Sequence, residues 1–150
     1  MSIQINDSTV RTSAPEERSV SDAMWRGAKQ KCPNCGEGAL YSSYLKVNDE
    51  CPKCGEELHH QRADDAPPYF TMFIVGHFVV AAVLAVEEAW APSLWVHALL
   101  WTPACIIPSL WMLPRVKGIL IGLQWAYRMH GFGGVDEEAI AAEKSLRPAD

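Results

Sequence analysis

Two short cysteine motifs place the tightest constraint on how this chain folds. Cys32 and Cys35 stand in the sequence CPNCG, and Cys51 and Cys54 in the sequence CPKCG, with fifteen residues between the motifs. This doubled spacing is that of a tetrahedral zinc site with four thiolate ligands. The glycine after each motif can take a positive φ, which lets backbone N–H groups point toward the sulfurs. The sequence therefore predicts a structural zinc ribbon, with two disulfides or unused thiols as alternatives.

Zinc also explains how so short a segment folds. Residues 25–62 contain few large apolar side chains, too few for a core that supports itself. Metal binding supplies the missing folding free energy. Residues 39–47 have the pattern of a strand, and residues 47–50 that of the turn that returns the chain to the second motif. Because four cysteines fill a tetrahedral site, no position remains for water and we expect no catalysis at this zinc.

Two apolar runs follow the ribbon. Residues 69–86 are eighteen residues without a formal charge, and residues 94–113 are twenty more. Each run is long enough to cross about 30 Å of hydrocarbon as a helix. A buried helical hairpin in a soluble globule is the alternative, but tryptophans near the ends of the runs favour a bilayer. We expect an α-helical membrane protein: a two-span transmembrane hairpin with a small N-terminal cytoplasmic β-type zinc ribbon and a C-terminal interfacial helix.

The basic residues indicate the orientation of this hairpin. Of the 13 lysines and arginines, eight precede the first run, five follow the second, and none lies in the connecting residues 87–93. By the positive-inside rule both termini and the ribbon face the cytoplasm. A reducing cytosol keeps the thiols free to bind metal. Residues 1–23 lack the apolar segment of a cleavable signal, so the first run must serve as the insertion signal.

These patterns divide the chain into eight expected segments. Pro114 is expected to break or kink the second span, because proline lacks the N–H of a helix interior. Beyond it, mixed apolar and basic residues indicate a helix lying at the membrane surface, and Gly118 and Gly122 form a GxxxG spacing. The segments are a disordered tail (1–23), the zinc ribbon (24–62), a juxtamembrane connector (63–68), transmembrane helix 1 (69–86), an outer loop (87–93), transmembrane helix 2 (94–114), an interfacial helix (115–131) and a polar tail (132–150).

Charged and imidazole side chains crowd the junction between ribbon and membrane. One aspartate of this stretch can cap the first span and interact with its dipole. Capping does not explain the other groups, which indicate a partner-docking surface or a second metal site. The residues concerned are His59, His60, Arg62, Asp64 and Asp65.

Nucleic acid is not an expected partner. The formal net charge is −5, and residues 25–62 carry six basic and five acidic side chains. Such a balance offers no electrostatic footprint for a phosphate backbone. A tethered module that docks a protein is the expected use of this ribbon.

His77 is an ionisable residue inside the first apolar run, and such residues are functional hypotheses by default. A rise of about 1.5 Å per residue places it at a depth similar to that of Cys105 on the antiparallel second run. Three interpretations remain open. His77 can donate to the carbonyl of Ala104, which Pro108 leaves without a donor, or it can contact a partner. It can also ligate metal or haem together with Cys105.

Several of these motifs together resemble a known family. They are CPxCGxGxLxxxYLKV, CxxCG, HHxRADDAPPYFTxxIVGHxVV and GLQWAYRMHGF. In this combination, over residues 24–133, the chain resembles a bacterial family catalogued as domain of unknown function nine-eight-three. Its members are described as small membrane proteins, often encoded beside genes for haem-copper cytochrome c oxidase and its assembly factors. The resemblance implies a bacterial inner-membrane protein, with the four motif cysteines at the family's ribbon positions and the junction residues and His77 on its other recurrent motifs.

The sequence contains no catalytic constellation: no phosphate-binding glycine loop, no nucleophile elbow and no HExxH. We therefore expect a non-enzymatic protein with structural zinc as its cofactor and the lipid bilayer as one partner. The resemblance implies that it is an assembly factor or accessory subunit of a haem-copper cytochrome c oxidase or a related respiratory complex. The alternatives are a membrane enzyme or transporter accessory that uses His59, His60, Asp64 and Asp65, or a homo-oligomeric membrane scaffold.

Overall fold

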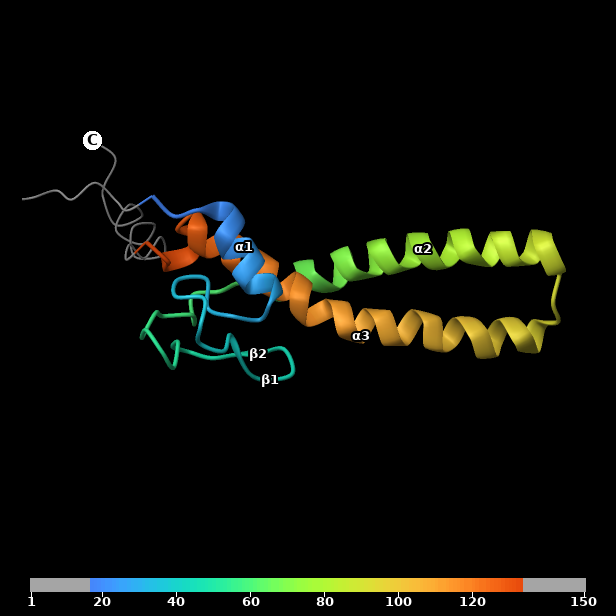
Figure 1. Cartoon of the computed structure of the whole chain (residues 1–150), viewed down its shortest axis with the longest axis horizontal. Helices are drawn as coiled ribbons and strands as arrows, with labels where there is room; N and C mark the ends of the chain where they lie inside the picture. Colours follow the sequence, from blue (N-terminus) through green and yellow to red (C-terminus); the bar gives the residue numbers. More distant parts are fainter. Residues whose placement is uncertain (1–16, 134–150) are drawn as a thin grey trace, which may run out of the picture.

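The protein is mostly helical, and its computed structural model describes residues 17–133. Two long helices run side by side, and the remaining elements gather at the end where the first begins and the second ends (Figure 1). Of the expected tails, 1–23 and 132–150, residues 1–16 and 134–150 lie outside the described residues. In chain order the elements are α1 (Val20–Ala28), β1 (Tyr41–Ser43), β2 (Lys46–Val47), α2 (Ala66–Trp90), α3 (Leu94–Ala126) and the short 3₁₀ helix η1 (Met129–Gly131).

Helices α2 and α3 form an antiparallel pair with an exposed apolar surface. Both are long and apolar enough to cross a membrane. Ala91 ends α2 with a left-handed φ of 42°, and the extended Ser93 precedes α3. Along the pair, large side chains such as Phe78 and Trp95 are 75% and 78% exposed. A soluble protein rarely exposes a continuous apolar surface of this extent, so the pair needs lipid or other protein around it.

Helix α3 continues through Pro114, where the sequence predicts a break or a kink. It is 33 residues long, and Pro114 lies inside it. The missing N–H of Pro114 deprives the carbonyl of Leu110 of its helical donor. The hydroxyl of Tyr44 donates to that carbonyl oxygen at 2.8 Å, and the hydroxyl of Tyr41 donates to the carbonyl of Pro114 at 2.7 Å. The expected break is therefore wrong, since the helix is continuous and the β1–β2 hairpin supplies a donor where Pro114 removes one, whereas the kink stays a prediction.

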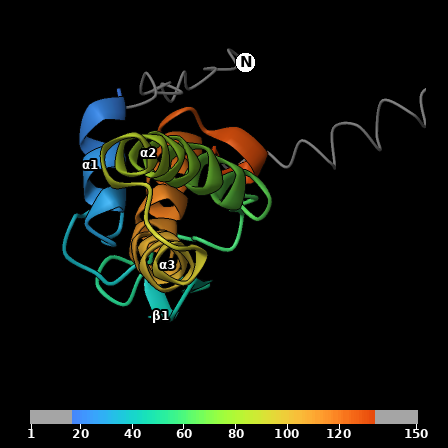
Figure 2. The same cartoon turned by 90° about the vertical axis from the view of Figure 1, so that its right-hand side faces the viewer.

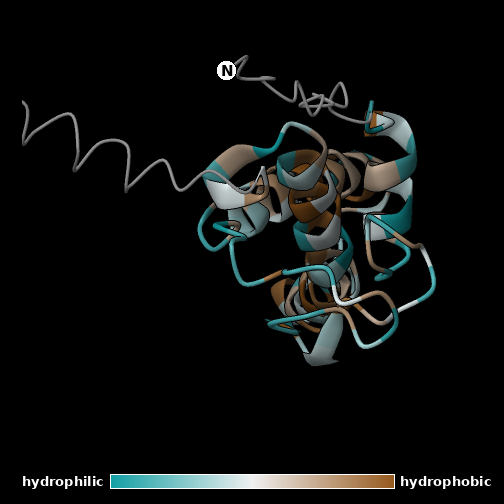
Figure 3. Ribbon diagram, turned by 90° about the vertical axis from the view of Figure 1, so that its left-hand side faces the viewer, coloured by the Kyte–Doolittle hydropathy of each residue, from teal (hydrophilic) through white to brown (hydrophobic). Residues whose placement is uncertain are grey.

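The last third of α3 is the centre of the ribbon domain. Ile121 is fully buried and Trp125 is 7% exposed, and both belong to one core with residues of α1 and the ribbon. Viewed from the end of the molecule that carries the ribbon domain, apolar turns of helix lie in the middle and mostly hydrophilic loops surround them (Figure 3). A separate interfacial helix at residues 115–131 is therefore a wrong prediction: protein covers this apolar face. The buried core is Ala23, Cys32, Leu40, Cys51, Leu58, Ala63, Ile121, Trp125 and Phe132.

Small residues bring α1 into backbone contact with α3. A Cβ atom on Gly118 would collide with the carbonyl of Gly27, and one on Gly122 with the carbonyl of Ala23. The GxxxG spacing of α3 thus meets a matching spacing of small residues on α1, rather than a second membrane helix. Seen from the loop end, α1 and β1 lie on different sides of α3 (Figure 2).

The expected disorder is wrong for residues 20–23, because they form the first turn of helix α1. Its first turn is capped by Ser19, whose hydroxyl oxygen accepts from the N–H of Asp22 at 3.4 Å. The helix is stabilised by its long-range packing on α3, which the local sequence does not reveal.

The ribbon contains a hairpin where one longer strand is expected. Strands β1 and β2 are antiparallel, with Tyr41 opposite Val47 and Ser43 opposite Lys46. Leu45 reverses the chain with a φ of 62°. The turn therefore comes earlier than the expected residues 47–50, and it directs two tyrosines toward α3.

Replacing Gly118 by alanine should weaken the ribbon domain by about 1–3 kcal/mol, because the new methyl group meets the backbone of α1. Gly76→Ala is the matched control, since a Cβ at Gly76 meets nothing within 4 Å. The control should be neutral or stabilising by up to about 1 kcal/mol through helix propensity. Heat-induced zinc release, followed with a chromophoric chelator on the full chain in detergent, measures both. Equal behaviour of the two variants would contradict the close α1–α3 packing.

Candidate metal centre

The four motif cysteines converge on one point. The sulfurs of Cys32 and Cys54 are 3.8 Å apart, as are those of Cys35 and Cys51. A regular tetrahedron with Zn–S bonds of about 2.3 Å has edges of about 3.8 Å. A disulfide would bring two sulfurs to about 2.0 Å, and all five cysteines are free. The donor set and its spacing therefore fit zinc, and the predicted metal ligands are brought together.

Each motif forms the same backbone turn. The N–H of Gly36 donates to the carbonyl of Cys32 at 2.9 Å, and that of Gly55 to the carbonyl of Cys51 at 3.0 Å. Both glycines have positive φ, 73° and 72°, as the sequence predicts. A residue with a Cβ is strained in this region, which explains glycine after each second cysteine.

A third glycine supports the site from behind. The N–H of Gly38 donates to the sulfur of Cys35 at 3.5 Å, and a Cβ on Gly38 would collide with the sulfur of Cys51. Its role was not assigned from the sequence, although the spacing CPxCGxG carries the signal. Gly38 leaves room for the second motif to close over the first.

The four thiols differ in their environment. Burial raises the pKa of the Cys32 thiol, and burial also raises that of Cys54. For Cys35 the raising effect of burial is outweighed by backbone N–H groups of Gly38 and Glu37, and its pKa falls to about 6. Cys35 is therefore more ready to act as a thiolate than Cys32 or Cys54, and the buried Cys32 needs a cation to stabilise its charge.

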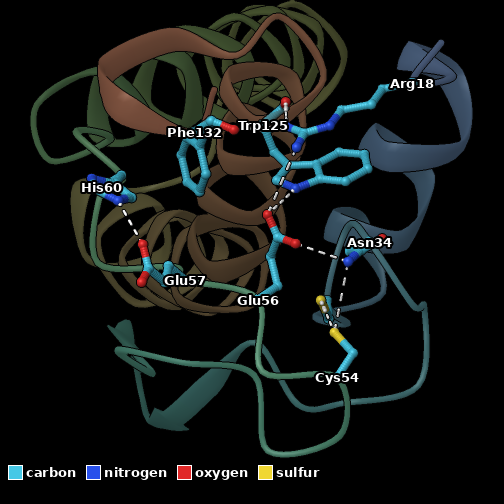
Figure 4. Close-up of polar contacts among 9 residues, drawn as sticks. Arg18, Asn34, Cys54, Glu56, Glu57, His60, Trp125 and Phe132 are labelled. Carbon is cyan, nitrogen blue, oxygen red and sulfur yellow. Dashed lines mark hydrogen bonds and ion pairs between the residues drawn. The ribbon is translucent and has the colours of Figure 1, made fainter. Parts of the chain in front are cut away.

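A hydrogen-bond network ties the metal centre to the end of α3 (Figure 4). One carboxylate oxygen of Glu56 accepts from the indole N–H of Trp125 at 2.7 Å, and the other accepts from the side-chain amide of Asn34 at 2.8 Å. The same amide lies 3.9 Å from the sulfur of Cys54. Arg18 adds an ion pair to Glu56 at 4.0 Å and donates to the carbonyl of Trp125 at 2.7 Å. Glu56 therefore links the two cysteine motifs to α3 and to Arg18, which precedes α1. The sequence did not suggest this role.

Two junction residues, Arg62 and Asp64, connect α3 to the segment before α2. The ammonium of Lys117 lies 3.4 Å from a carboxylate oxygen of Asp64, and the backbone N–H of Arg62 donates to the side chain of Gln124 at 3.1 Å. Asp65 is the N-terminal boundary residue of α2 but makes no capping hydrogen bond with its side chain. The predicted capping is therefore wrong for Asp65, and Asp64 pairs with α3 instead.

The two junction histidines belong to a different group. His59 and His60 lie against Glu57, and one ligand atom from each of the three side chains lies within 4.8 Å of the others. Asp64 and Asp65 are not part of this group. The predicted His-His and Asp-Asp cluster is thus divided between two places in the fold.

His77 does not make the expected bond to Ala104. Its Nδ1–H donates to the carbonyl oxygen of Phe73, one turn earlier in α2, at 2.7 Å. His77 lines an open apolar groove along α2 with Gly76, whereas Ala104 lines another groove between α2 and α3. Cys105 is exposed, and neither residue belongs to a group of three or more metal-binding side chains among residues 17–133. The local carbonyl satisfies the Nδ1–H of His77, so this hydrogen bond is structural but intrahelical.

A family model described as "Protein of unknown function (DUF983)" matches residues 41–125, more than half of the 150 residues. The chain belongs to the DUF983 family. The DUF983 match includes the second cysteine motif, the junction, α2 and nearly all of α3. It begins after the first cysteine motif and α1, so it is narrower than the resemblance over residues 24–133. No curated protein and no solved structure matches the chain.

Replacing Cys51 by serine should abolish stoichiometric zinc binding, because three thiolates and a hydroxyl close the tetrahedral site poorly. Cys105→Ser is the matched control, since this exposed thiol lies outside the cluster. Metal analysis of the purified full chain should find about one zinc per chain for the control and the unaltered protein. Loss of zinc from the Cys105 variant would contradict the assignment.

Trp125→Phe should destabilise the ribbon on α3 by about 1–3 kcal/mol, because it removes the indole donor from a partly buried carboxylate. We expect the variant to transfer its zinc to a chromophoric chelator faster than the unaltered protein does. Trp95→Phe, on an exposed position of the same helix, is the control and should leave that rate unchanged. Equal rates in both variants would show that the Glu56 network does not support the metal centre.

Proposed function

We propose that this DUF983 protein is a non-enzymatic protein of the bacterial inner membrane, with α2 and α3 as a transmembrane hairpin and the zinc ribbon in the cytoplasm. It serves as an assembly factor or accessory subunit of a haem-copper cytochrome c oxidase or a related respiratory complex. The observation that carries the proposal is the continuity of α3 from the exposed apolar pair into the buried core of the ribbon domain.

Exposure supports the transmembrane placement. The core helix of a soluble protein is mostly buried. In this structure none of the most apolar 18 residues of α3 is buried, and only 11% of the most apolar 18 residues of α2. Helices of 25 and 33 residues extend about 37 and 50 Å at 1.5 Å per residue. About 20 residues suffice to cross the hydrocarbon, so the remainder of α3 is available to the ribbon domain.

Charge supports the orientation. The ribbon domain lies at the end where α2 begins and α3 ends, and all 13 lysines and arginines precede α2 or follow the apolar part of α3. The opposite end carries Glu87 and Glu88 and no basic residue. Under the positive-inside rule this places the ribbon and both ends of the chain in the cytoplasm.

The structure of the zinc centre supports a binding role rather than catalysis. Four cysteines complete the coordination of one ion and leave no position for a substrate or water. The ribbon is fixed to α3 by the Tyr41 and Tyr44 hydroxyls and by Glu56, so its surface is held at a set position relative to the hairpin. A rigid module at the membrane surface suits docking of a membrane partner.

The oxidase as partner rests on the family resemblance. Members of the family are often encoded beside genes for the oxidase and its assembly factors, and the exposed faces of α2 and α3 offer helices to a membrane complex. The groove along α2, with the unobstructed Gly76 at its centre, is one place where another helix can approach closely.

Affinity capture of the tagged chain from mild-detergent membranes tests the proposal. We expect mass spectrometry to find oxidase subunits in the eluate and an optical spectrum to show haem. The test variant is Gly118→Ala, whose loosened ribbon should recover less oxidase than the unaltered chain while its hairpin still inserts. Presence in the mature complex would identify an accessory subunit, and presence only with incomplete complexes an assembly factor.

A colourless eluate containing only the chain itself would overturn the oxidase role and favour a homo-oligomeric scaffold. Capture of a different membrane complex without haem would equally contradict it. In either case the zinc site and the family membership stand, because they rest on separate observations.

A further inference from the structure

Glu57, His59 and His60 form a compact group of metal-binding side chains outside the cysteine site. One ligand atom from each side chain lies within 4.8 Å of the other two. The imidazole Nε2 of His60 is 3.1 Å from a carboxylate oxygen of Glu57, and the centres of the two imidazole rings are 4.0 Å apart. Ligands around a tetrahedral ion with bonds of about 2.0 Å stand about 3.3 Å apart. The His60–Glu57 pair already has about this spacing, and the exposed His59 has a ligand atom within 4.8 Å of both.

The position of His60 is built into the fold. Gly131 has a φ of 99°, and a Cβ on it would lie 2.6 Å from the Nδ1 of His60, so the backbone of η1 packs directly against the imidazole. The ring of Phe132 meets it edge-on at 5.9 Å between centres. In Figure 4, His60 and Glu57 lie together on the opposite side of Phe132 from the Arg18 network. These contacts leave the Nε2 atom pointing at Glu57.

The backbone beneath the group is also held in place. The N–H groups of Leu58 and His59 both donate to the carbonyl of Asp49, at 2.7 and 3.1 Å, and the side chain of Leu58 is fully buried. Glu57 pairs across an antiparallel bridge with Glu50. The three ligand side chains therefore stand on a fixed segment that the cysteine site, three residues upstream, anchors.

A histidine–carboxylate hydrogen bond of the same kind exists elsewhere in the molecule. Nε2 of His97 lies 2.9 Å from a carboxylate oxygen of Glu87, while its Nδ1 accepts from the indole of Trp101 at 2.9 Å. Both nitrogens of His97 are thus occupied, and within residues 17–133 no third metal-binding side chain joins that pair. The group around His60 differs by its second imidazole and by a neighbouring hollow.

We propose that Glu57, His59 and His60 bind a divalent transition-metal ion at a second site, distinct from the structural zinc. Two imidazoles and one carboxylate suit Zn²⁺, Co²⁺, Ni²⁺ or Cu²⁺, whereas Mg²⁺ and Ca²⁺ prefer oxygen ligands. Three protein ligands leave one position open, to water or to a donor atom of another molecule. A hollow of about 330 Å³ lined by Gly55, Glu56, Glu57, His60, Gly131 and Phe132 adjoins the group and gives access to that position.

This site binds its metal more weakly than the cysteine site and exchanges it more readily, because it has fewer and more exposed ligands. The proposal does not depend on the oxidase role or on membrane orientation.

Cobalt titration of the full chain, purified in detergent with a histidine-free tag and loaded with zinc at the cysteines, tests the site. We expect one Co²⁺ to bind per chain, with d–d absorption but without thiolate charge-transfer bands, because the ligands are nitrogen and oxygen. His59→Asn and Glu57→Gln should each weaken this binding about tenfold or more. Both side chains are exposed, so retention of the cysteine-bound zinc should show that the variants remain folded.

His97→Asn is the matched control, since it removes a histidine from the other histidine–carboxylate pair and should leave cobalt affinity unchanged. Absence of cobalt binding beyond the structural zinc would overturn the proposal. So would equal affinity in all variants, which would place the ion elsewhere. Cobalt with thiolate charge-transfer bands would place it in the cysteine site and would overturn the proposal as well.

Discussion

The meeting of four thiolates at one point is the constraint on which the rest of the structure depends. From the first cysteine motif to the end of the ribbon, only two large aliphatic side chains, Leu40 and Leu58, are fully buried. So small a core does not hold a chain in place, and the geometry of the cysteines fits an ion that does. With the motifs joined, the hairpin between them can hold Tyr41 and Tyr44 against α3, and Glu56 can reach Trp125.

Helix α3 serves two environments with one continuous backbone. Its first part presents apolar side chains outward, while its last third is enclosed by α1, the ribbon and η1. Pro114 lies where these two parts of α3 meet. There, tyrosine hydroxyls from the β1–β2 hairpin donate to the carbonyls of Leu110 and of Pro114 itself. The ribbon domain therefore stabilises the helix at the point where proline weakens it. In return, the helix supplies the large apolar side chains that the ribbon lacks.

The features that were predictable are those with local causes. Cysteine spacing identifies the four side chains that meet in a group able to hold a metal ion, glycine after each motif identifies the positive φ, and uninterrupted apolar runs identify the two long helices. The failures have distant causes. The GxxxG of α3 has α1 as its partner, and Pro114 is tolerated because of tyrosines about 70 residues earlier. His77 is the exception with a local cause, because it uses the nearest carbonyl in its own helix rather than one on a neighbouring helix.

The sequence by itself determined the cysteine ligands, the apolar lengths and the segregation of basic residues, because each depends on spacing and composition along the chain. Only the tertiary structure decided what the junction residues do. His59 and His60 lie beside Glu57 rather than beside the two aspartates, and Asp64 pairs with Lys117. The reason is physical: side chains adjacent in sequence are directed apart by the turn from ribbon to helix, and their partners come from segments that only folding brings near.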